Sequence, residues 1–150
     1  MRITCFSFLM FCAVLSCSQT APPSTDDYSG MYTFLRDGEF VQITIEDQGK
    51  VSGFISRYGD TESDKNSFID QFFESGKFDG KSLNFATKPV HGVWFTFTGT
   101  LGRGPGQTPE EEGYFALRGT LTRFKTDTSE KTTREPRTVE LKSFPRDAAP

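Results

Sequence analysis

The feature that most constrains the fold of this chain is a succession of short segments in which apolar and polar residues alternate. The alternation is clearest in residues 93–101, where Val, Phe and Leu fall on one face and Trp and Thr on the other. Residues 39–46 show the same period of two. That period is typical of a strand buried on one face, and the preceding Asp37-Gly38 pair is a strong hairpin signal. The pattern therefore predicts an all-β, mainly antiparallel meander.

The whole chain offers seven or eight such strands. We expect them at residues 28–36, 39–46, 51–58, 82–87, 93–101, 114–124 and 138–144. Residues 102–112 are expected to form a long loop, and the charged residues 125–137 another.

Residues 67–75 are ambiguous. Their phenylalanines and isoleucine share one helical face, Ser67 and Asp70 can form a capping box, and Gly76 can end a helix. A strand fits less well because Phe72 and Phe73 are adjacent. We therefore favour a short helix here and leave the strand as the alternative.

Glycines inside the strands indicate curvature. Residues 95–101 (FTFTGTL) echo residues 115–121 (FALRGTL), and Gly99 and Gly119 fall on the apolar face, as Gly53 does in its own strand. Glycine weakens a strand, but a missing side chain on the concave face lets a sheet coil. With 16 phenylalanines in the chain, we expect a small barrel or strongly rolled sheet with an aromatic core.

The first strand adds a family resemblance. It opens Tyr28-Ser-Gly30-Met-Tyr32, and with the meander this resembles the up-and-down barrels of the lipocalin and avidin kind, the calycins. Those chains typically begin with Gly-x-Trp, on which a basic residue from a late strand packs. The resemblance implies that Tyr32 replaces the Trp and that Arg118 or Arg123 is the basic partner. It rests on one short pattern and the topology, and it implies no particular ligand.

The N-terminus has the features of an export signal. In residues 1–17 a single arginine precedes an apolar run of signal-core length, which is shorter than the roughly 20 residues needed to span a bilayer. Residues 13–17 (AVLSC) resemble a relaxed bacterial lipobox, which implies lipid attachment at Cys17. Simple cleavage after Ser16 or Ser18 stays open as the alternative.

The remaining chain divides into a tether, a domain and a tail. Residues 18–27 read as a flexible tether, 28–144 as a β-barrel domain and 145–150 as a disordered tail. All three cysteines lie in the first 17 residues, so the mature domain has no thiol for a disulfide or a metal site. We expect an exported protein anchored to a membrane of the bacterial cell envelope, on its periplasmic or extracellular face, or otherwise secreted.

The chain carries no set of residues typical of catalysis or metal binding. His91 is the only histidine, too few for a zinc site without cysteine, and it lies in a turn where we expect it to be solvated. Asp60, Glu62, Asp64 and Asn66 alternate as in a calcium loop, but the glycine and the final glutamate of that motif are missing. We expect a solvated acidic loop, no metal, no cofactor and no catalytic residue.

Trp94 is the most informative candidate for binding. It lies on the Thr-rich face of its strand, and Phe54 and Tyr58 lie on the polar face of theirs. These three residues, with Arg118, are our candidate ligand-binding set. The alternative is that the aromatic rings pack under the segment 67–75 or are scattered over the surface.

The sequence thus predicts an exported, lipid-anchored, non-enzymatic barrel that binds a small molecule or an envelope protein. No basic cluster interleaves with aromatics, so a nucleic-acid partner is not expected. One alternative is a structural or interaction lipoprotein with a filled barrel. Another is a hydrolase or isomerase in which His91 meets a carboxylate within a cleft.

Overall fold

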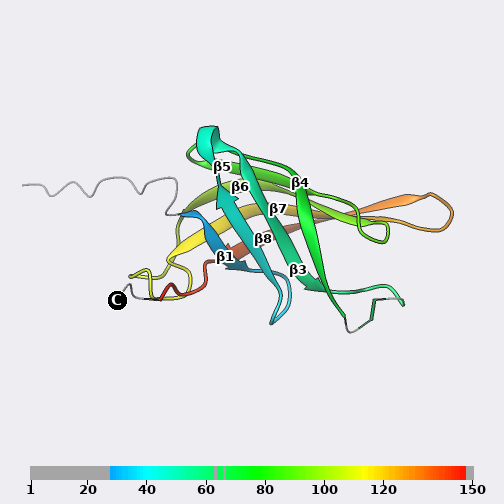
Figure 1. The fold of residues 1–150 in the computed structure, drawn as a ribbon, viewed down its shortest axis with the longest axis horizontal. Helices are drawn as coiled ribbons and strands as arrows, with labels where there is room; N and C mark the ends of the chain where they lie inside the picture. The colour runs from blue at the N-terminus through cyan, green and yellow to red at the C-terminus, as the bar shows by residue number, and fades with distance from the viewer. Residues whose placement is uncertain (1–27, 63, 66, 148–150) are drawn as a thin grey trace, which may run out of the picture.

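The fold is a single antiparallel meander of eight strands (Figure 1). The computed structural model describes residues 28–62, 64–65 and 67–147, so the predicted signal (1–17), tether (18–27) and last residues of the tail lie outside the described part. Each strand pairs with the next one in sequence, which confirms the predicted fold class. The strands are β1 Gly30–Thr33, β2 Phe40–Ile45, β3 Val51–Tyr58, β4 Phe68–Phe78, β5 Ser82–Thr87, β6 Val93–Arg103, β7 Phe115–Thr126 and β8 Thr132–Lys142.

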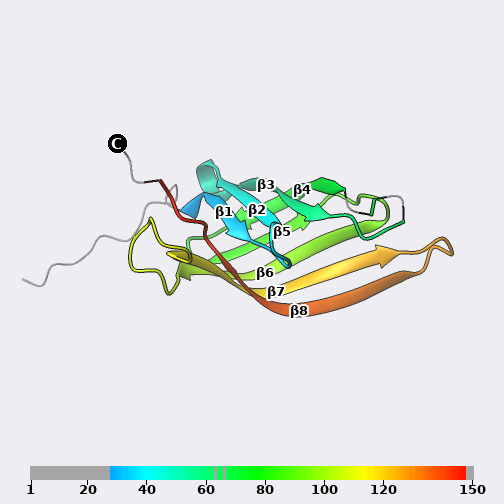
Figure 2. The same cartoon turned by 90° about the horizontal axis from the view of Figure 1, so that it is seen from below.

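The sheet curls into a half-barrel whose first and last strands meet at one end only. There the Phe144 amide donates to the Met31 carbonyl oxygen and the Lys142 amide donates to Thr33 Oγ1, each at 2.9 Å. Tyr32 and Ser143 form the single bridge between these strands. The β7–β8 hairpin projects beyond the other strands (Figures 1 and 2), and the gap that it leaves beside β1 is called the seam below. Among the described residues no helix has the length and apolarity needed to cross a membrane.

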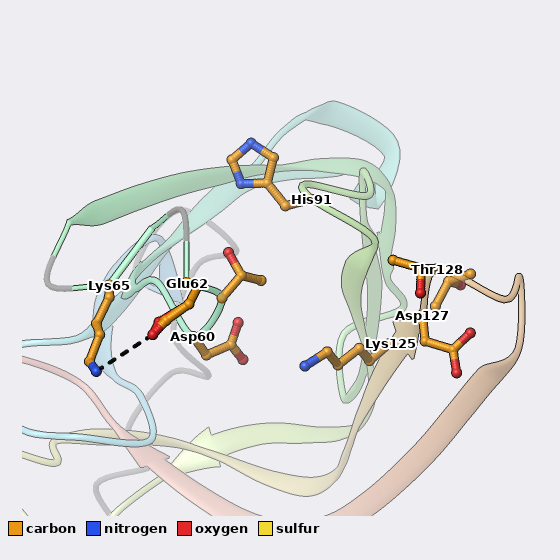
Figure 3. A pocket seen from close by; sticks show the side chains of 9 residues that line it. Asp60, Glu62, Lys65, His91, Lys125, Asp127 and Thr128 are labelled. Atoms are coloured by element: carbon orange, nitrogen blue, oxygen red, sulfur yellow. Dashed lines mark ion pairs between the residues drawn. The ribbon is translucent and has the colours of Figure 1, made fainter.

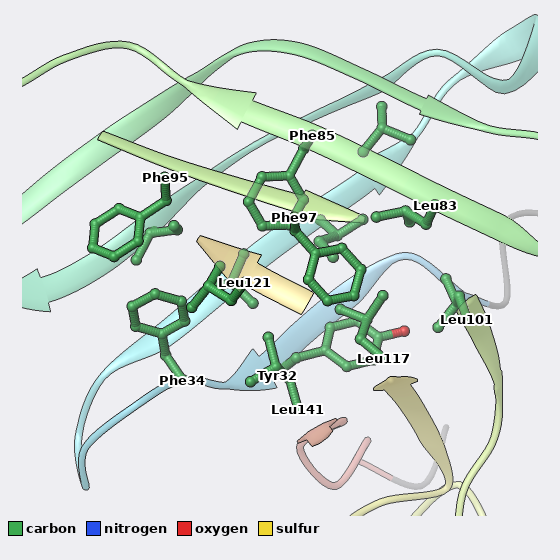
Figure 4. Packing of buried hydrophobic residues seen from close by; sticks show 14 of the residues in the cluster. Tyr32, Phe34, Leu83, Phe85, Phe95, Phe97, Leu101, Leu117, Leu121 and Leu141 are labelled. Atoms are coloured by element: carbon green, nitrogen blue, oxygen red, sulfur yellow. The ribbon is translucent and has the colours of Figure 1, made fainter. Parts of the chain in front are cut away.

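Aromatic rings fill the concave face of the sheet. Phe85 stacks on Phe73 at 4.3 Å and on Phe97 at 5.5 Å between ring centroids, so one column of rings crosses β4, β5 and β6. Phe34 and Phe95 meet edge to face beside it (Figure 4). Burying one large apolar side chain stabilises a fold by about 1.5–3 kcal/mol. This aromatic interior is therefore the main source of stability, as predicted.

Glycines allow the strands around this core to approach closely. Gly99 and Gly119 are opposite each other in the β6–β7 pair. A Cβ atom on Gly119 would collide with the Thr98 carbonyl oxygen and with the Cα of Gly99. A Cβ on Gly53 would meet the Gln42 carbonyl oxygen in the same way. The absence of side chains at these positions is thus a steric requirement of the curl, which supports the interpretation made from the sequence.

The helix predicted for residues 67–75 is wrong, because this segment is part of β4. The strand alternates in the opposite sense from usual: Phe68 and Phe72 are exposed on the outer face, and Gln71 is fully buried on the inner face. Phe73 then points to the core and stacks on Phe85. Because apolar residues lie on both faces of this strand, its sequence does not show the apolar–polar alternation by which strands are recognised.

The loop predicted for residues 125–137 is also wrong. β8 begins at Thr132 and pairs with β7 without interruption from Lys142 back to Thr132. Its first seven residues are exposed, because they lie in the projecting hairpin and face the seam. Their charged composition therefore follows from contact with solvent within a strand and does not indicate a loop. Pro136 is compatible with this strand because the edge that faces the seam needs no amide donor there.

The predicted packing of Arg118 or Arg123 on Tyr32 is not found. Tyr32 is fully buried, and its hydroxyl donates to the Tyr28 carbonyl oxygen at 2.6 Å. Burial raises the pKa of Tyr32, and the nearby positive charge that opposes this rise belongs to Arg146. Arg118 instead pairs with Glu140 on the outer face. The positive charge that acts on Tyr32 thus follows the last strand, where the Arg146 guanidinium lies over the ring of Phe115 at 5.3 Å from its centroid.

The glycine pair gives a direct test of the fold. We expect G119A to lower the free energy of unfolding by about 2 kcal/mol or more, because backbone atoms cannot move away as a flexible side chain would. Gly102 is a matched control in the neighbouring strand, since a Cβ there would meet no atom within 4 Å. G102A should therefore change stability little in urea denaturation. Equal effects of the two substitutions would contradict the steric role of the pair.

Candidate functional site

The candidate site is the open end of the half-barrel, called the mouth here. It lies where the β1–β2, β3–β4, β5–β6 and β7–β8 connections gather. A hollow of about 720 Å³ opens between residues 60–62 and Lys65 on one side and His91 and residues 125–128 on the other (Figure 3). Ligand pockets commonly have volumes of roughly 300–1,000 Å³, so the hollow is large enough for a small molecule.

Charges of both signs line the hollow. Asp60 and Glu62 lie on one side and Lys125 and Asp127 on the other, with the Lys125 amino group directed into the space between (Figure 3). The Asp127 carboxylate accepts hydrogen bonds from the Ser129 and Lys131 backbone amides of its own turn. Lys65 and Glu62 form a long, exposed ion pair of 3.9 Å, which contributes little to stability. The rim is therefore adaptable, and its groups remain available to a polar ligand.

The floor of the mouth is held by a network of buried charges. Asp60 is shared by two guanidinium groups, that of Arg57 from β3 at 3.5 Å and that of Arg123 from β7. Arg57 Nε also donates to Gln71 Oε1 at 3.1 Å. The Gln71 amide in turn donates to the Lys88 and Val93 carbonyl oxygens. These bonds tie together β3, β4, β7 and the β5–β6 connection under the hollow.

The network joins the aromatic core directly below it. The guanidinium of Arg57 lies 5.3 Å from the centroid of the Phe95 ring, a distance at which a cation is attracted to the ring face. The Arg57 side chain is only 4% exposed. The mouth is therefore a charged surface laid on an aromatic interior, and a ligand has access to its upper side only.

Electrostatics favour the ionised form of Asp60. Partial burial by itself would raise the pKa of Asp60, but the hydrogen bond and charge of Arg123, together with the charge of Arg57, hold that pKa below its usual value. Burial lowers the pKa of Arg57, and the charge of Asp60 opposes this shift. Each group therefore stabilises the charged form of the other.

The His91 side chain is 57% exposed, in line with the solvated turn residue that the sequence predicts, and it also has a partner. Its turn position is confirmed, with φ of 48°, but its Nδ1 lies 2.8 Å from Asp64 Oδ2. A carboxylate on Nδ1 orients an imidazole in many hydrolases, whose nucleophile then meets Nε2. In the described ranges no hydroxyl or thiol is recorded at Nε2 of His91. The pair thus supplies an oriented imidazole that links the β3–β4 and β5–β6 connections, without a nucleophile.

The acidic residues of the β3–β4 connection do not converge on one point. Asp60 contacts arginines, Glu62 contacts Lys65, and Asp64 accepts a hydrogen bond from Thr61 Oγ1 at 2.6 Å. Asn66, the fourth member of the calcium-like pattern, lies outside the described residues. Within the described part of the chain no three His, Cys, Asp or Glu side chains are placed to hold a metal ion.

The structure does not bring the candidate binding residues together. Phe54 and Tyr58 lie on the outer face of β3, where they contact Phe72 and Phe68 of β4. Trp94 stacks in parallel on Phe124 at 5.1 Å, on the outer face of β6 and β7. Arg118 is on the outer face of β7, paired with Glu140. None of these four residues lines the hollow at the mouth.

The sequence reasoning missed the residues that form the floor of the mouth. A signal for them exists, because Arg57 follows Val51, Gly53 and Ile55 in the inward phase of β3. Arg123 likewise follows Leu117, Gly119 and Leu121 in the inward phase of β7. When an arginine occupies the next inward-facing position after a series of buried apolar residues, its charge is expected to lie inside the barrel. Such a buried charge needs a partner of opposite sign.

The shared carboxylate predicts a stability that depends on pH. Because the folded state lowers the pKa of Asp60, its stabilisation is complete above the unfolded pKa and is lost as pH falls through the folded pKa. We expect D60N to lower the free energy of unfolding by about 1–2 kcal/mol at neutral pH, with a difference from wild type that shrinks in acid. Urea denaturation from neutral pH to about pH 3 measures this. E62Q, at an exposed pair of the same loop, is the control, and an acid profile of D60N that matches wild type would refute the assignment.

Comparison with known proteins supports the fold. No family model matches the chain, and no curated protein matches it either. Among solved structures, rhizavidin is similar with a TM-score of 0.57 at 13% identity, over 81% of this chain and 86% of that one. A rhizavidin–biotin complex is similar with a TM-score of 0.55 at 13% identity, over 77% of this chain and 98% of that one. Shwanavidin, at 14% identity over 77% and 94% of the two chains, has a TM-score of 0.48. The chain therefore has an avidin-like β-barrel fold, in agreement with the resemblance found in its sequence.

Proposed function

We propose that this protein is a non-catalytic binding module that holds a small polar ligand at its mouth. The observation that carries the proposal is the open hollow of about 720 Å³ at the end of the barrel. Its floor is rigid, because Asp60, Arg57 and Gln71 fix one another, and its rim offers the amino group of Lys125 and the long, exposed pair of Glu62 and Lys65. A preorganised floor under an adaptable rim suits reversible capture of a small molecule.

The lining favours a ligand that carries charges or several hydrogen-bonding groups. Lys125 and Asp127 stand near each other on the wall formed by the β7–β8 hairpin, and Asp60 and Glu62 face them (Figure 3). A zwitterion or a carboxylic acid with polar substituents can pair with both signs at once. The rhizavidin structure with biotin shows that a barrel of this fold can take a small molecule.

A second function is favoured by the filled interior. The ring column of Phe73, Phe85 and Phe97 and the neighbouring Phe95 occupy the space in which a deep ligand would lie. If the mouth binds nothing, the domain serves as a structural or interaction module of the cell envelope. Ligand titration separates the two functions.

We place this module outside the cytoplasm, anchored by lipid on Cys17. The supports are those of the sequence: the apolar run that ends at Cys17, the lipobox-like residues 13–17 and the absence of cysteine from the rest of the chain. The tether 18–27 then holds the half-barrel close to the membrane.

Binding at the mouth is tested with a panel of amino acids, dicarboxylic acids and biotin. Hits from thermal-shift screening are measured by isothermal titration calorimetry. For a charged hit, K125A or E62A should weaken binding about tenfold or more, because each removes a charge-assisted contact at an exposed position of the hollow. E140A, at an exposed ion pair on the outer face, is the control and should leave the affinity unchanged. Failure of the whole panel, or equal losses in all three variants, would count against the mouth.

The anchor is tested by intact-mass spectrometry of the membrane fraction. We expect an N-terminal Cys17 that carries acyl chains, and we expect C17A to move the protein out of that fraction. An unmodified N-terminus at Cys17, or one at Gln19, would defeat the anchor while leaving the mouth untouched.

A further inference from the structure

The convex face of β2–β4 carries aromatic rings that the proposed ligand site does not use. Phe40 lies 6.5 Å from Phe144 and 5.9 Å from Phe54, and Phe54 lies 5.5 Å from Phe72. Tyr58 and Phe68 form a second contact at 4.3 Å beside this row. These residues are called the outer aromatic face: Phe40, Phe54, Tyr58, Phe68, Phe72 and Phe144.

Two of these rings are markedly exposed. Phe68 is 51% and Phe72 57% exposed, the largest values among the big apolar side chains of the described residues. Exposed phenylalanines that are grouped with other rings on one face are a mark of an interaction surface. The concave side of the sheet already holds the core, so these rings contribute little to folding.

Charged side chains flank the most exposed ring. Asp70 lies between Phe68 and Phe72 on the outer side of β4, opposite Ser56. In the parts of the chain that the structure describes, no ion pair or hydrogen bond of its carboxylate is recorded. On the other side, Lys88 joins Phe54 and Phe72 in lining a shallow hollow of about 430 Å³. An unpaired carboxylate and an ammonium group thus stand on either side of Phe72.

We propose that the outer aromatic face rests on the surface of the phospholipid bilayer to which the chain is tethered. Phe68 and Phe72 enter the boundary between headgroups and acyl chains, which lies roughly 5–10 Å below the surface. Asp70 meets the ammonium group of a zwitterionic headgroup, and Lys88 meets its phosphate. This inference rests on the proposed anchor at Cys17.

The length of chain outside the described residues supports a membrane as the occupant. Residues 18–27 span at most about 36 Å when fully extended, which is about the length of the 11-residue strand β4. A domain on so short a tether stays within its own length of the bilayer. Its exposed rings therefore meet lipid at a high effective concentration.

A second copy of the chain is the other candidate occupant, because Lys88 of one copy would be available to Asp70 of the other. The short tether favours the bilayer over a second copy, and the oligomeric state of C17A, measured below, separates the two. Strongly anionic lipid fits less well, because the whole chain carries a net charge of −3.

The test measures the depth of this face in vesicles. The full-length protein, processed and purified from the membrane fraction, is reconstituted in phosphatidylethanolamine–phosphatidylcholine vesicles that contain brominated lipid. Trp94 is the only tryptophan and lies on the outer face of β6, which β5 separates from β4. Wild type therefore serves as the matched control for the double variant F72W/W94F, whose single indole lies on the outer aromatic face.

We expect bromine to quench the F72W/W94F indole strongly and Trp94 little. Adding D70N and K88Q should reduce the quenching at position 72, and F68A should shift the indole emission toward that of an indole in water. In flotation assays of unlipidated C17A, we expect F68A/F72A to lower vesicle affinity about tenfold, since two half-exposed rings lose their transfer into lipid.

Equal quenching of the two indoles in anchored protein would overturn the proposal while leaving the anchor intact. A concentration-dependent dimer of C17A that F68A/F72A abolishes would also overturn it. If mass spectrometry shows no lipid, the anchor fails. The same variants are then titrated with excess vesicles to test whether the outer aromatic face contacts the bilayer. Preferential quenching of the indole at position 72 supports that contact, and its absence refutes it.

Discussion

The close approach of β6 and β7 at two facing glycines is the constraint on which the rest of the structure depends. Gly99 and Gly119 leave no room for a side chain, and their lack of one lets the longest strands of the sheet bend around the rings of Phe85 and Phe97. A flat sheet of the same residues would leave that apolar face in water. The curl therefore turns eight locally paired strands into a domain with an interior.

The curl also determines where polar chemistry can occur. Because the aromatic rings occupy the depth of the half-barrel, charges are displaced to its open end. There Arg57 and Arg123 reach inward from opposite walls to the same carboxylate, that of Asp60. The result is a floor whose charges are paired inside the protein and a rim where the Lys125 amino group and a weak, exposed Glu62–Lys65 pair face the hollow. This separation of paired floor charges from accessible rim charges suits a site that binds small ligands at its surface and does not bury them in the barrel.

Much of the fold could be predicted from the sequence, because alternation and turn residues are local signals. β3 and β5 begin and end where the alternation does. β4, predicted as a helix with a strand as the alternative, and the first part of β8 differ from the prediction for two different physical reasons. The outer face of β4 is apolar and its inner face holds Gln71, which reverses the usual pattern. The first part of β8 is exposed and carries the composition of a loop. The candidate site was harder still, since the contact between Asp60 and Arg123 joins residues 63 apart in sequence, and no spacing rule predicts it.

The seam has a consequence for how the chain folds. Every strand pairs with its neighbour in sequence, so the sheet can grow by successive local hairpins, each closing a short loop. The exception is the group of contacts that joins the end of the chain to its first strand, among them Lys142 with Thr33, 109 residues apart, and Arg146 with Ser29, 117 residues apart. Bringing such distant residues together carries the largest loop-closure entropy in the molecule. We expect closure at this point to be the late, slow event of folding, and the projecting β7–β8 hairpin to form early and locally.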